Sequence, residues 1–332
     1  MKSFAMSRIA VIIVNYNAAD LAVAAVESVR ARHHGGHRVD IHLVDNASPA
    51  GDGAVLARTA RDRNWGGQVT LYPETENHGF GRGNNLVLRR LADGGDPPDF
   101  VFLLNPDAQL DNEAIAILAD FLDRHPRAAM AGAQARNPGD DAPVPAAFRF
   151  PGAASHFASA LNFGPVARLM TDSQVALGGD LATRRVDWVS GAAVLARFDV
   201  WRDLGFFDPA YFLYYEEVDL MRRAARAGWE CWHVAEARII HVEGASTDVR
   251  SARSDRVRRP AYWYESWRHY FRSNHGKAGA LGVAMAWLAG AGLNLPLARI
   301  RGQQPAAPLN FFGDFWALSL RPLLGLRPGR LR

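Results

Sequence analysis

The stretch "IAVIIVNYN" (residues 9–17) decides the fold that we expect for this chain. Its six apolar residues, 9–14, predict a buried strand, and Asn15 ends the run. The run is too short for the core of a signal peptide, and no small-residue cleavage site follows it. We therefore expect the chain to begin with a strand of a folded domain.

Outward from this strand, short apolar runs alternate with patterns of helical spacing. Further strands are expected at 40–48, 99–108, 186–196 and 230–242, and helices at 20–34, 81–92, 111–125 and 211–223. Such alternation predicts an α/β protein with a mostly parallel central sheet. Residues 134–185 carry no motif that indicates a function, although 151–170 have helical character.

Polar residues follow three of the expected strands. They are Asn15 and Asn17, Asp45 and Asn46, and Asn105 and Asp107. Any one cluster could be ordinary turn chemistry, because Asn and Asp favour turns and helix caps. Ligands of open α/β sheets bind at the carboxyl ends of strands, near a switch in strand order. Three clusters at three strand ends therefore predict one cleft.

The stretch "YFLYYEEVDLMRR" (residues 211–223) places three carboxylates against four aromatic residues. A helix start explains Asp219, because acidic residues favour the first turn and two arginines follow three and four residues on. Glu216 and Glu217 have no such local cation, and a buried charge without a partner is costly. This pair is the candidate for a chemical role.

Composition restricts the chemistry. Cys231 is the single cysteine of the 332 residues, so there is no disulfide framework and no thiolate metal cluster, which suits a reducing compartment. "GFGRGN" (79–84) has Asn84 where a dinucleotide fingerprint needs its third glycine. An aspartate and a histidine at strand ends, Asp107 and His241, could hold a divalent metal with positions open for phosphate oxygens. His241 could equally be a core residue.

The charge is uneven along the chain. Residues 246–332 contain 14 Lys or Arg and 4 Asp or Glu, a net charge of +10, whereas the whole chain carries +4. "RVRRPAYWYESWRHYFR" (256–272) interleaves arginine with aromatic residues, a pattern found in single-strand nucleic-acid sites and at membrane interfaces. Residues 278–298 are uncharged and long enough to span a bilayer, but Asn294, Pro296 and four glycines favour a surface position. We expect an anionic membrane surface as the partner, and no nucleic acid.

Several segments together resemble a known family. "VIIVNYN", "VDNAS", "NHGFGRGNN", "LLNPDA", "RIIHVEGAS" and the long segment 188–229 occur in the order of the family 2 inverting glycosyltransferases, and most resemble the bacterial rhamnosyltransferase branch. The resemblance covers roughly residues 8–248. It implies a GT-A fold, a nucleotide-sugar donor and Mg²⁺ or Mn²⁺.

The resemblance also implies roles for single residues. Tyr16, Asn17 and Asp45 would line the nucleoside pocket, Gly79 would lie near the sugar-phosphate, and Trp188 and Gly191 would lie by the donor sugar and acceptor. "NPD" stands where many relatives have Asp-x-Asp, so Asp107 and His241 would bind the metal, with Asn105 a weaker contact. Glu217 occupies the position of the catalytic base, and Glu216 is the alternative.

The expected protein has a catalytic domain at 1–248 and a basic, aromatic helical region at 249–332 that associates with membranes. We expect a cytoplasmic enzyme, peripheral on the inner face of the cell membrane. It would move L-rhamnose from dTDP-rhamnose to a lipid-linked or polysaccharide acceptor in cell-envelope glycan synthesis, with a dTDP- or UDP-sugar as the general class of donor. The alternatives are another sugar (galactofuranose, glucose or N-acetylglucosamine) and a catalytically silent GT-A binding module.

Overall fold

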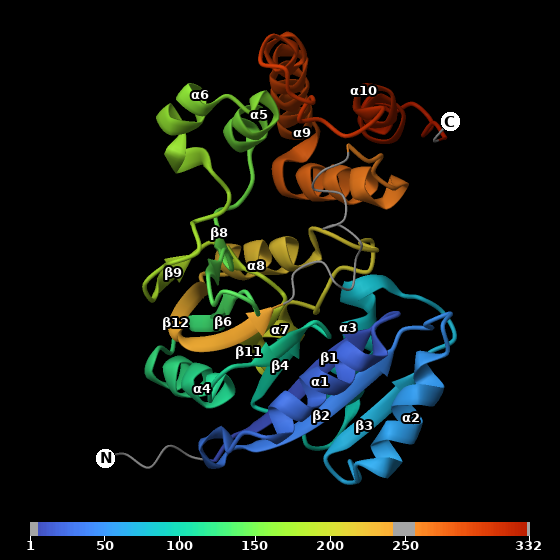
Figure 1. Cartoon of the computed structure of the whole chain (residues 1–332), viewed down its shortest axis with the longest axis vertical. Helices are drawn as coiled ribbons and strands as arrows, with labels where there is room; N and C mark the ends of the chain where they lie inside the picture. Colours follow the sequence, from blue (N-terminus) through green and yellow to red (C-terminus); the bar gives the residue numbers. More distant parts are fainter. Residues whose placement is uncertain (1–5, 242–255, 331–332) are drawn as a thin grey trace.

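A computed structural model of the chain describes residues 6–241 and 256–330. The predicted first strand is β1 (Arg8–Asn15), which pairs in parallel with β2 (Arg38–Asp45) on one side and β4 (Phe100–Leu104) on the other. Beyond β2 lies the parallel strand β3 (Val69–Pro73). The order β3-β2-β1-β4 reverses between β1 and β4, which places a switch point there. The predicted α/β fold is confirmed (Figure 1).

The second half of the sheet is mixed. It continues from β4 in the order β11-β6-β12-β5. These strands are β11 (Ala193–Arg197), β6 (Ala128–Arg136), β12 (Glu230–His241) and β5 (Ala108–Leu110). The short strands β7 (Pro143–Val144) and β9 (Arg184–Val186) pair with β6 and β12, while β8 (Ala147–Phe148) and β10 (Trp188–Val189) form a separate pair.

Two predicted strands are each interrupted. The strand expected at 99–108 is β4 and β5, separated by a turn in which the Ala108 N–H donates to the Asn105 carbonyl at 3.1 Å. The strand expected at 186–196 is divided among β9, β10 and β11. There Ala192 accepts a hydrogen bond from the Asn105 N–H at 2.9 Å. Both interruptions bring irregular backbone to the carboxyl end of β4.

Helices cover both faces of the sheet. They are α1 (Ala19–Arg30), α2 (Asp52–Asp62), α3 (Gly79–Asp93), α4 (Ala114–Arg124), α7 (Phe198–Asp203) and α8 (Glu216–Arg226), with a 3₁₀ turn η1 (His34–Gly36). Alternate residues of β1 point to opposite faces. Val11 and Ile13 join the core under α1 and α4, whereas Ile12 joins the core under α3 and α8.

A helical unit sits above the sheet in Figure 1. It consists of α5 (Ala153–Leu161), α6 (Gly164–Leu169), η2 (Thr171–Ser173), α9 (Ala261–Ile300), α10 (Phe311–Phe315), the π-helical turn η4 (Trp316–Leu320) and α11 (Arg321–Leu323). We call residues 153–173 and 261–326 the helical unit. A positive φ at Gly276 divides α9 into two limbs, visible in Figure 1.

The helix α5 packs on α9 although more than 100 residues separate them. Asn294 donates its amide to the Leu161 carbonyl at 2.9 Å, and a Cβ at Gly290 would lie 2.4 Å from the Phe157 carbonyl. Part of the segment without a motif therefore belongs, by its contacts, with the C-terminal helices. The predicted domain boundary at 248 and 249 lies outside the described residues and stays a prediction.

By length and composition, α9 passes the test for a membrane-crossing helix. It has 40 residues, its best window has a mean hydropathy of 1.5, and 33% of that window is buried in the protein. The core helix of a soluble protein passes the same test, so this result by itself does not place α9 in a bilayer.

Candidate active site

A cavity of about 660 Å³ opens at the carboxyl ends of β1, β2 and β4. Asn17, Asn46 and Asn105 line it, one from each of the three polar clusters at the strand ends. The predicted convergence of these clusters on one cleft is therefore present, beside the switch point between β1 and β4. Much of the remaining wall comes from the start of α3, residues 190–192, the loop before α8 with the first residues of α8, and the segment 257–262.

The start of α3 is fixed by asparagines. The Asn46 amide donates to the Asn77 side chain at 3.0 Å and to the Gly79 carbonyl at 3.1 Å, and its oxygen accepts from the His78 N–H at 3.0 Å. Gly79 has a φ of +75°, and a Cβ there would lie 1.8 Å from the Phe212 carbonyl oxygen. Only glycine lets α3 approach the loop before α8 this closely.

The predicted nucleoside residues lie in different settings. Tyr16 and Asn17 line the cavity, and Tyr16 is 38% exposed. Asp45 is buried and does not line it; its carboxylate accepts from the Asn15 amide at 3.1 Å and the Ser48 hydroxyl at 2.6 Å. Ser48 in turn accepts from the Asn17 N–H at 2.9 Å. Asp45 thus supports the loop that carries Asn17, and its contact with a nucleoside stays a prediction.

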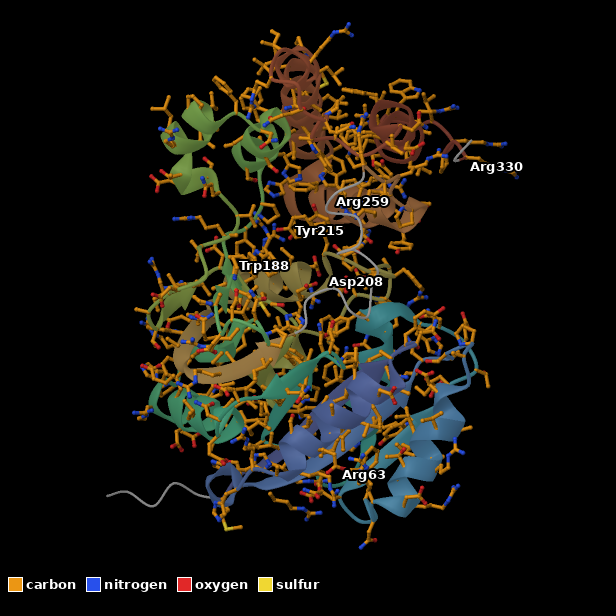
Figure 2. The ribbon with its side chains drawn as sticks, in the orientation of Figure 1. Arg63, Trp188, Asp208, Tyr215, Arg259 and Arg330 are labelled. Carbon is orange, nitrogen blue, oxygen red and sulfur yellow. The ribbon has the colours of Figure 1, made fainter. Side chains whose placement is uncertain are left out.

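The carboxylate pair opens α8 and faces the cavity, which both Glu216 and Glu217 line. The two residues before it, Tyr214 and Tyr215, have φ values of 72° and 70°. Left-handed backbone at bulky residues is strained, and such strain gathers at functional sites. Tyr215, labelled in Figure 2, packs against Tyr270 and Phe271 of α9, with ring centroids 5.0 and 6.1 Å away.

Burial shapes the charge of this pair. It raises the pKa of Glu216, which is 2% exposed, well above its ordinary value, and the neighbouring Glu217 charge raises it further. Burial also raises the pKa of Glu217. One carboxyl oxygen of each side chain has no hydrogen-bond partner within the described part of the chain. Glu216 therefore favours the protonated form, and the negative charge of the pair rests on Glu217.

Asp219 has the structural role of a helix-start residue. Its carboxylate pairs with Arg223 at 2.8 Å and accepts from the Asn274 amide at 3.1 Å. Arg223 also donates to the Leu204 and Phe206 carbonyls. Asp219 does not line the cavity, and it fastens α8 to α9.

The two predicted metal ligands are adjacent. The Asp107 Oδ1 and His241 Nε2 atoms lie 3.3 Å apart, because β5 pairs with β12 so that Ala108 faces His241. His241 lines a smaller cavity of about 60 Å³ that shares Ser190 and Ala192 with the main one. Within residues 6–241 and 256–330, no group of three His, Cys, Asp or Glu side chains could hold a metal. One carboxylate and one imidazole, with phosphate oxygens completing the shell, still fit Mg²⁺ or Mn²⁺.

Of the two residues predicted near the sugars, one borders the cavity. Gly191 lines it, and a Cβ there would lie 3.1 Å from the Phe80 ring. Trp188 does not line it: its ring stacks on Phe148 with centroids 4.1 Å apart, and its indole N–H donates to the Arg149 carbonyl at 2.9 Å. A direct contact between Trp188 and a sugar stays a prediction.

Sequence reasoning missed one wall of the cavity. Arg258, Arg259 and Tyr262 line it, although their segment was expected only at a membrane. No local pattern ties this segment to strand ends more than 150 residues earlier. The interleaved arginine and aromatic residues do indicate an anion site, which is the one signal that could have suggested it.

Comparisons with known proteins agree with this geometry. Residues 10–178 match the family "Glycosyl transferase family 2". The chain is 33% identical over 217 residues to the N-acetylglucosaminyl-diphospho-decaprenol L-rhamnosyltransferase of Mycobacterium tuberculosis, covering 63% of this chain and 68% of that protein. It is 24% identical over 166 residues to the rhamnosyltransferase WbbL of Escherichia coli, covering 49% of this chain and 61% of WbbL.

Solved structures show the same fold. The mannosyltransferase of Pyrobaculum calidifontis in complex with GDP-Man and Mn²⁺ superimposes with a TM-score of 0.56 at 17% identity, over 97% of this chain and 83% of that one. GalNAc-T7 with UDP, GalNAc and Mn²⁺ gives a TM-score of 0.53 at 14% identity, over 71% and 44%. The chain belongs to glycosyl transferase family 2: it is a glycosyltransferase of the GT-A fold, in the rhamnosyltransferase-like branch.

Proposed function

We propose that this enzyme transfers L-rhamnose from dTDP-rhamnose to a sugar linked through diphosphate to a membrane lipid, in cell-envelope glycan synthesis. One observation carries the proposal: the buried Glu216, the half-buried Glu217 and the strand-end asparagines face a single cavity at the switch point of the sheet. The relative from M. tuberculosis supports the sugar and the acceptor class, because its name specifies both.

The chemistry follows from the carboxylate pair. The acceptor hydroxyl oxygen attacks the anomeric carbon, and Glu217 takes the hydroxyl proton as the new bond forms. The bond from the anomeric carbon to the donor phosphate breaks, and its electron pair leaves with the nucleoside diphosphate. Glu216 keeps its own proton, because its pKa is raised by burial and by the Glu217 charge. A single displacement without a covalent intermediate inverts the anomeric centre.

Asp107 and His241 are the residues that would hold Mg²⁺ or Mn²⁺ in this enzyme. When bound, the ion supplies positive charge against the departing diphosphate. Asn105, which lines the cavity beside them, would contact the donor. Mn²⁺ in the two similar solved structures supports this assignment.

Attachment to the inner face of the membrane is part of the proposal. The net charge of +10 on residues 246–332 suits an anionic leaflet, and α9 is long and apolar. A lipid-linked acceptor lies in that leaflet, so attachment would bring the cavity to its substrate.

The donor is identified by thermal unfolding with a panel of nucleotide sugars, with and without Mn²⁺. Ligand that binds the native state adds about 2.7 kcal/mol to the free energy of unfolding at 100 times Kd, and so raises the midpoint temperature. We expect the largest rise with dTDP-rhamnose plus Mn²⁺. A larger rise with a UDP- or GDP-linked sugar would make that sugar the donor in place of dTDP-rhamnose. No rise with any nucleotide sugar would favour the alternative, a catalytically silent binding module.

The base is tested with Glu217→Gln, which keeps the shape of the side chain but cannot accept the proton. We expect turnover to fall by at least about 10³-fold, at the upper part of the range for general-base catalysis, while donor affinity stays within twofold. Glu76→Gln is the matched control, because Glu76 is exposed and does not line the cavity. Full turnover by Glu217→Gln would remove Glu217 from this role.

A further inference from the structure

Three arginines in the segment 256–259 have different environments. Arg256 donates to the Ala307 and Pro308 carbonyls at 2.5 and 3.1 Å. Arg258 forms a two-pronged ion pair with Asp314, with both N–O distances at 2.6 Å. These two side chains fix the segment against the start of α10. They are anchors, and they leave the third arginine in a fixed position.

The third arginine, Arg259, differs from the other two, because no acceptor for its guanidinium lies within the described part of the chain. It lines the main cavity and is half-buried. Within the described part of the chain, no residue accepts a hydrogen bond from it, and its buried Nε atom has no partner. Its one described contact is with the face of Trp263, 5.9 Å from the guanidinium carbon to the ring centroid. A guanidinium that loses water without gaining an acceptor is costly, unless a ligand supplies the acceptor.

Arg259 lies on the carboxylate side of the cavity. Its charge acts on the hydroxyls of Tyr214 and Tyr262, opposing the burial that raises the pKa of each. The same Tyr214 hydroxyl is close enough to feel the charges of Glu216 and Glu217. The rings of Tyr214 and Tyr262 stack with centroids 6.2 Å apart, and both residues line the cavity together with Arg259. Figure 2 shows Arg259 at the foot of the helical unit.

The proposed metal ligands border a different part of the site. Asp107 pairs with His241, and the small cavity beside His241 meets the main cavity at Ser190 and Ala192. Arg259, Tyr214 and Tyr262 line the main cavity, whereas Asp107 and His241 do not. A donor phosphate bound near Asp107 and a phosphate bound by Arg259 would therefore occupy different places.

We propose that Arg259 and Tyr262 form a second anion subsite that binds a phosphate of the lipid-linked acceptor. This inference rests on the proposed function, in which the acceptor sugar is joined to its lipid through a diphosphate. With the acceptor hydroxyl at Glu217, the diphosphate reaches Arg259, and the lipid continues toward the helical unit. Arginine suits the task because its planar fork donates two parallel hydrogen bonds to phosphate oxygens.

Two acceptors that differ only in the diphosphate provide the test: N-acetylglucosaminyl diphosphate on a short alkyl chain, and the uncharged alkyl N-acetylglucosaminide. We expect Arg259→Gln to raise KM for the diphosphate acceptor at least tenfold, and to leave KM for the uncharged acceptor and for the donor within twofold. Arg259→Lys keeps the charge without the planar fork, so its KM for the diphosphate acceptor should lie between those of the unaltered protein and of Arg259→Gln. Arg272→Gln is the matched control, because Arg272 is exposed on α9, the helix that follows Arg259, and does not line the cavity.

Two kinetic outcomes would overturn the subsite. A rise in donor KM, with acceptor KM unchanged, would assign Arg259 to the donor phosphate. An equal rise in KM for both acceptors would mean that Arg259 only shapes the wall.

A binding measurement separates this inference from the proposed function. Titration of the protein with the diphosphate acceptor alone, without donor, needs no turnover. Weaker binding by Arg259→Gln than by Arg272→Gln supports the subsite even if dTDP-rhamnose proves to be the wrong donor. Equal binding by both variants, or none by the unaltered protein, overturns it, and unchanged thermal midpoints show that both variants are folded.

Discussion

At the scale of single residues, the position of Glu217 depends on strained neighbours. Tyr214 and Tyr215 both adopt left-handed backbone, at a cost of about 1–3 kcal/mol each. The aromatic side chains of α9 offset this cost, because Tyr215 packs between Tyr270 and Phe271. The aromatic residues before the carboxylates therefore have two uses: they remove water from the pair, and they fix its backbone.

The pH dependence of the reaction follows from this burial. A base must be ionised to accept a proton, and burial raises the pKa of Glu217 above its ordinary value of 4.5. The rate should therefore fall as pH decreases through a midpoint that lies above 4.5. A profile of kcat/KM against pH, with the protein shown to be folded at each point, measures it.

Glu216→Gln is the comparison for this profile. Glu216 is already neutral in our assignment, so the pH midpoint of kcat/KM in Glu216→Gln should equal that of the unaltered protein. The folded-state pKa of Glu216 is raised, so its contribution to stability declines as pH rises from 4.5 through that raised pKa. The variant should accordingly gain stability over the unaltered protein at pH 8. A midpoint at the ordinary carboxyl value, or one displaced by Glu216→Gln, would contradict the assignment.

At the scale of elements, the site depends on the meeting of α3 and the loop before α8. The Phe80 N–H donates to the Phe212 carbonyl at 3.2 Å, and Asn85 exchanges two hydrogen bonds with the Phe207 backbone at 2.8 and 3.1 Å. These contacts join the start of α3 at Gly79, where we propose that the donor binds, to the loop that leads into the carboxylate pair. A change at Gly79 should therefore affect both sides.

Gly79→Ala tests this junction. The new Cβ would lie 1.8 Å from the Phe212 carbonyl oxygen, and the φ of +75° is unfavourable for alanine. We expect a loss of more than about 2 kcal/mol in the free energy of unfolding, together with weaker donor binding. Denaturant unfolding measures the first and a titration with donor the second. Gly95→Ala is the control, because no atom lies within 4 Å of its Cβ and its φ is not positive; similar losses in both variants would contradict the argument.

The elements also show which parts of the fold the sequence could predict. The apolar run of β1 and the helical spacing of α1, α3 and α4 are local signals, and those elements were expected within a few residues of their observed ends. The helix α2 and strand β3 were not expected. In β3 no residue is fully buried, so the strand lacks the continuous apolar run that marked the others.

At the scale of the whole molecule, long-range contacts limit what a sequence reveals about the site. The strand-end clusters and the carboxylate pair were expected at the cavity because each has a local pattern, and the pairing of β5 with β12 brings Asp107 to His241 as the resemblance implied. The place of Arg259 depends on the packing of α9 over α8, which no local pattern encodes. Neither Trp188 nor Asp45 lines the cavity, because Trp188 stacks on Phe148 and Asp45 is held by Asn15 and Ser48, so their contacts with substrate stay predictions.

Exposed apolar side chains are concentrated at one end of the molecule. Apart from Met6, Tyr16 and Val257, all the large hydrophobic residues that are exposed in the described structure belong to the helical unit. They are Leu169, Met285, Leu293, Leu295, Ile300, Leu309, Phe312, Trp316, Leu324 and Leu326. In Figure 1 this unit forms the end of the molecule opposite α2 and β3. Apolar side chains beside arginines suit a surface that enters the lipid headgroups.

Membrane attachment is best tested with single side chains, because removal of residues 256–332 would also remove the wall that carries Arg259 and Tyr262. We expect the protein to float with anionic vesicles and not with neutral ones. Half-burial of two aliphatic side chains contributes about 1.5–3 kcal/mol, so Leu293→Asp with Ile300→Asp should weaken binding at least tenfold. Met6→Asp, at the other end and 78% exposed, should change nothing. High salt should weaken binding by screening, and flotation that neither the double variant nor salt affects would mean that another surface meets the lipid.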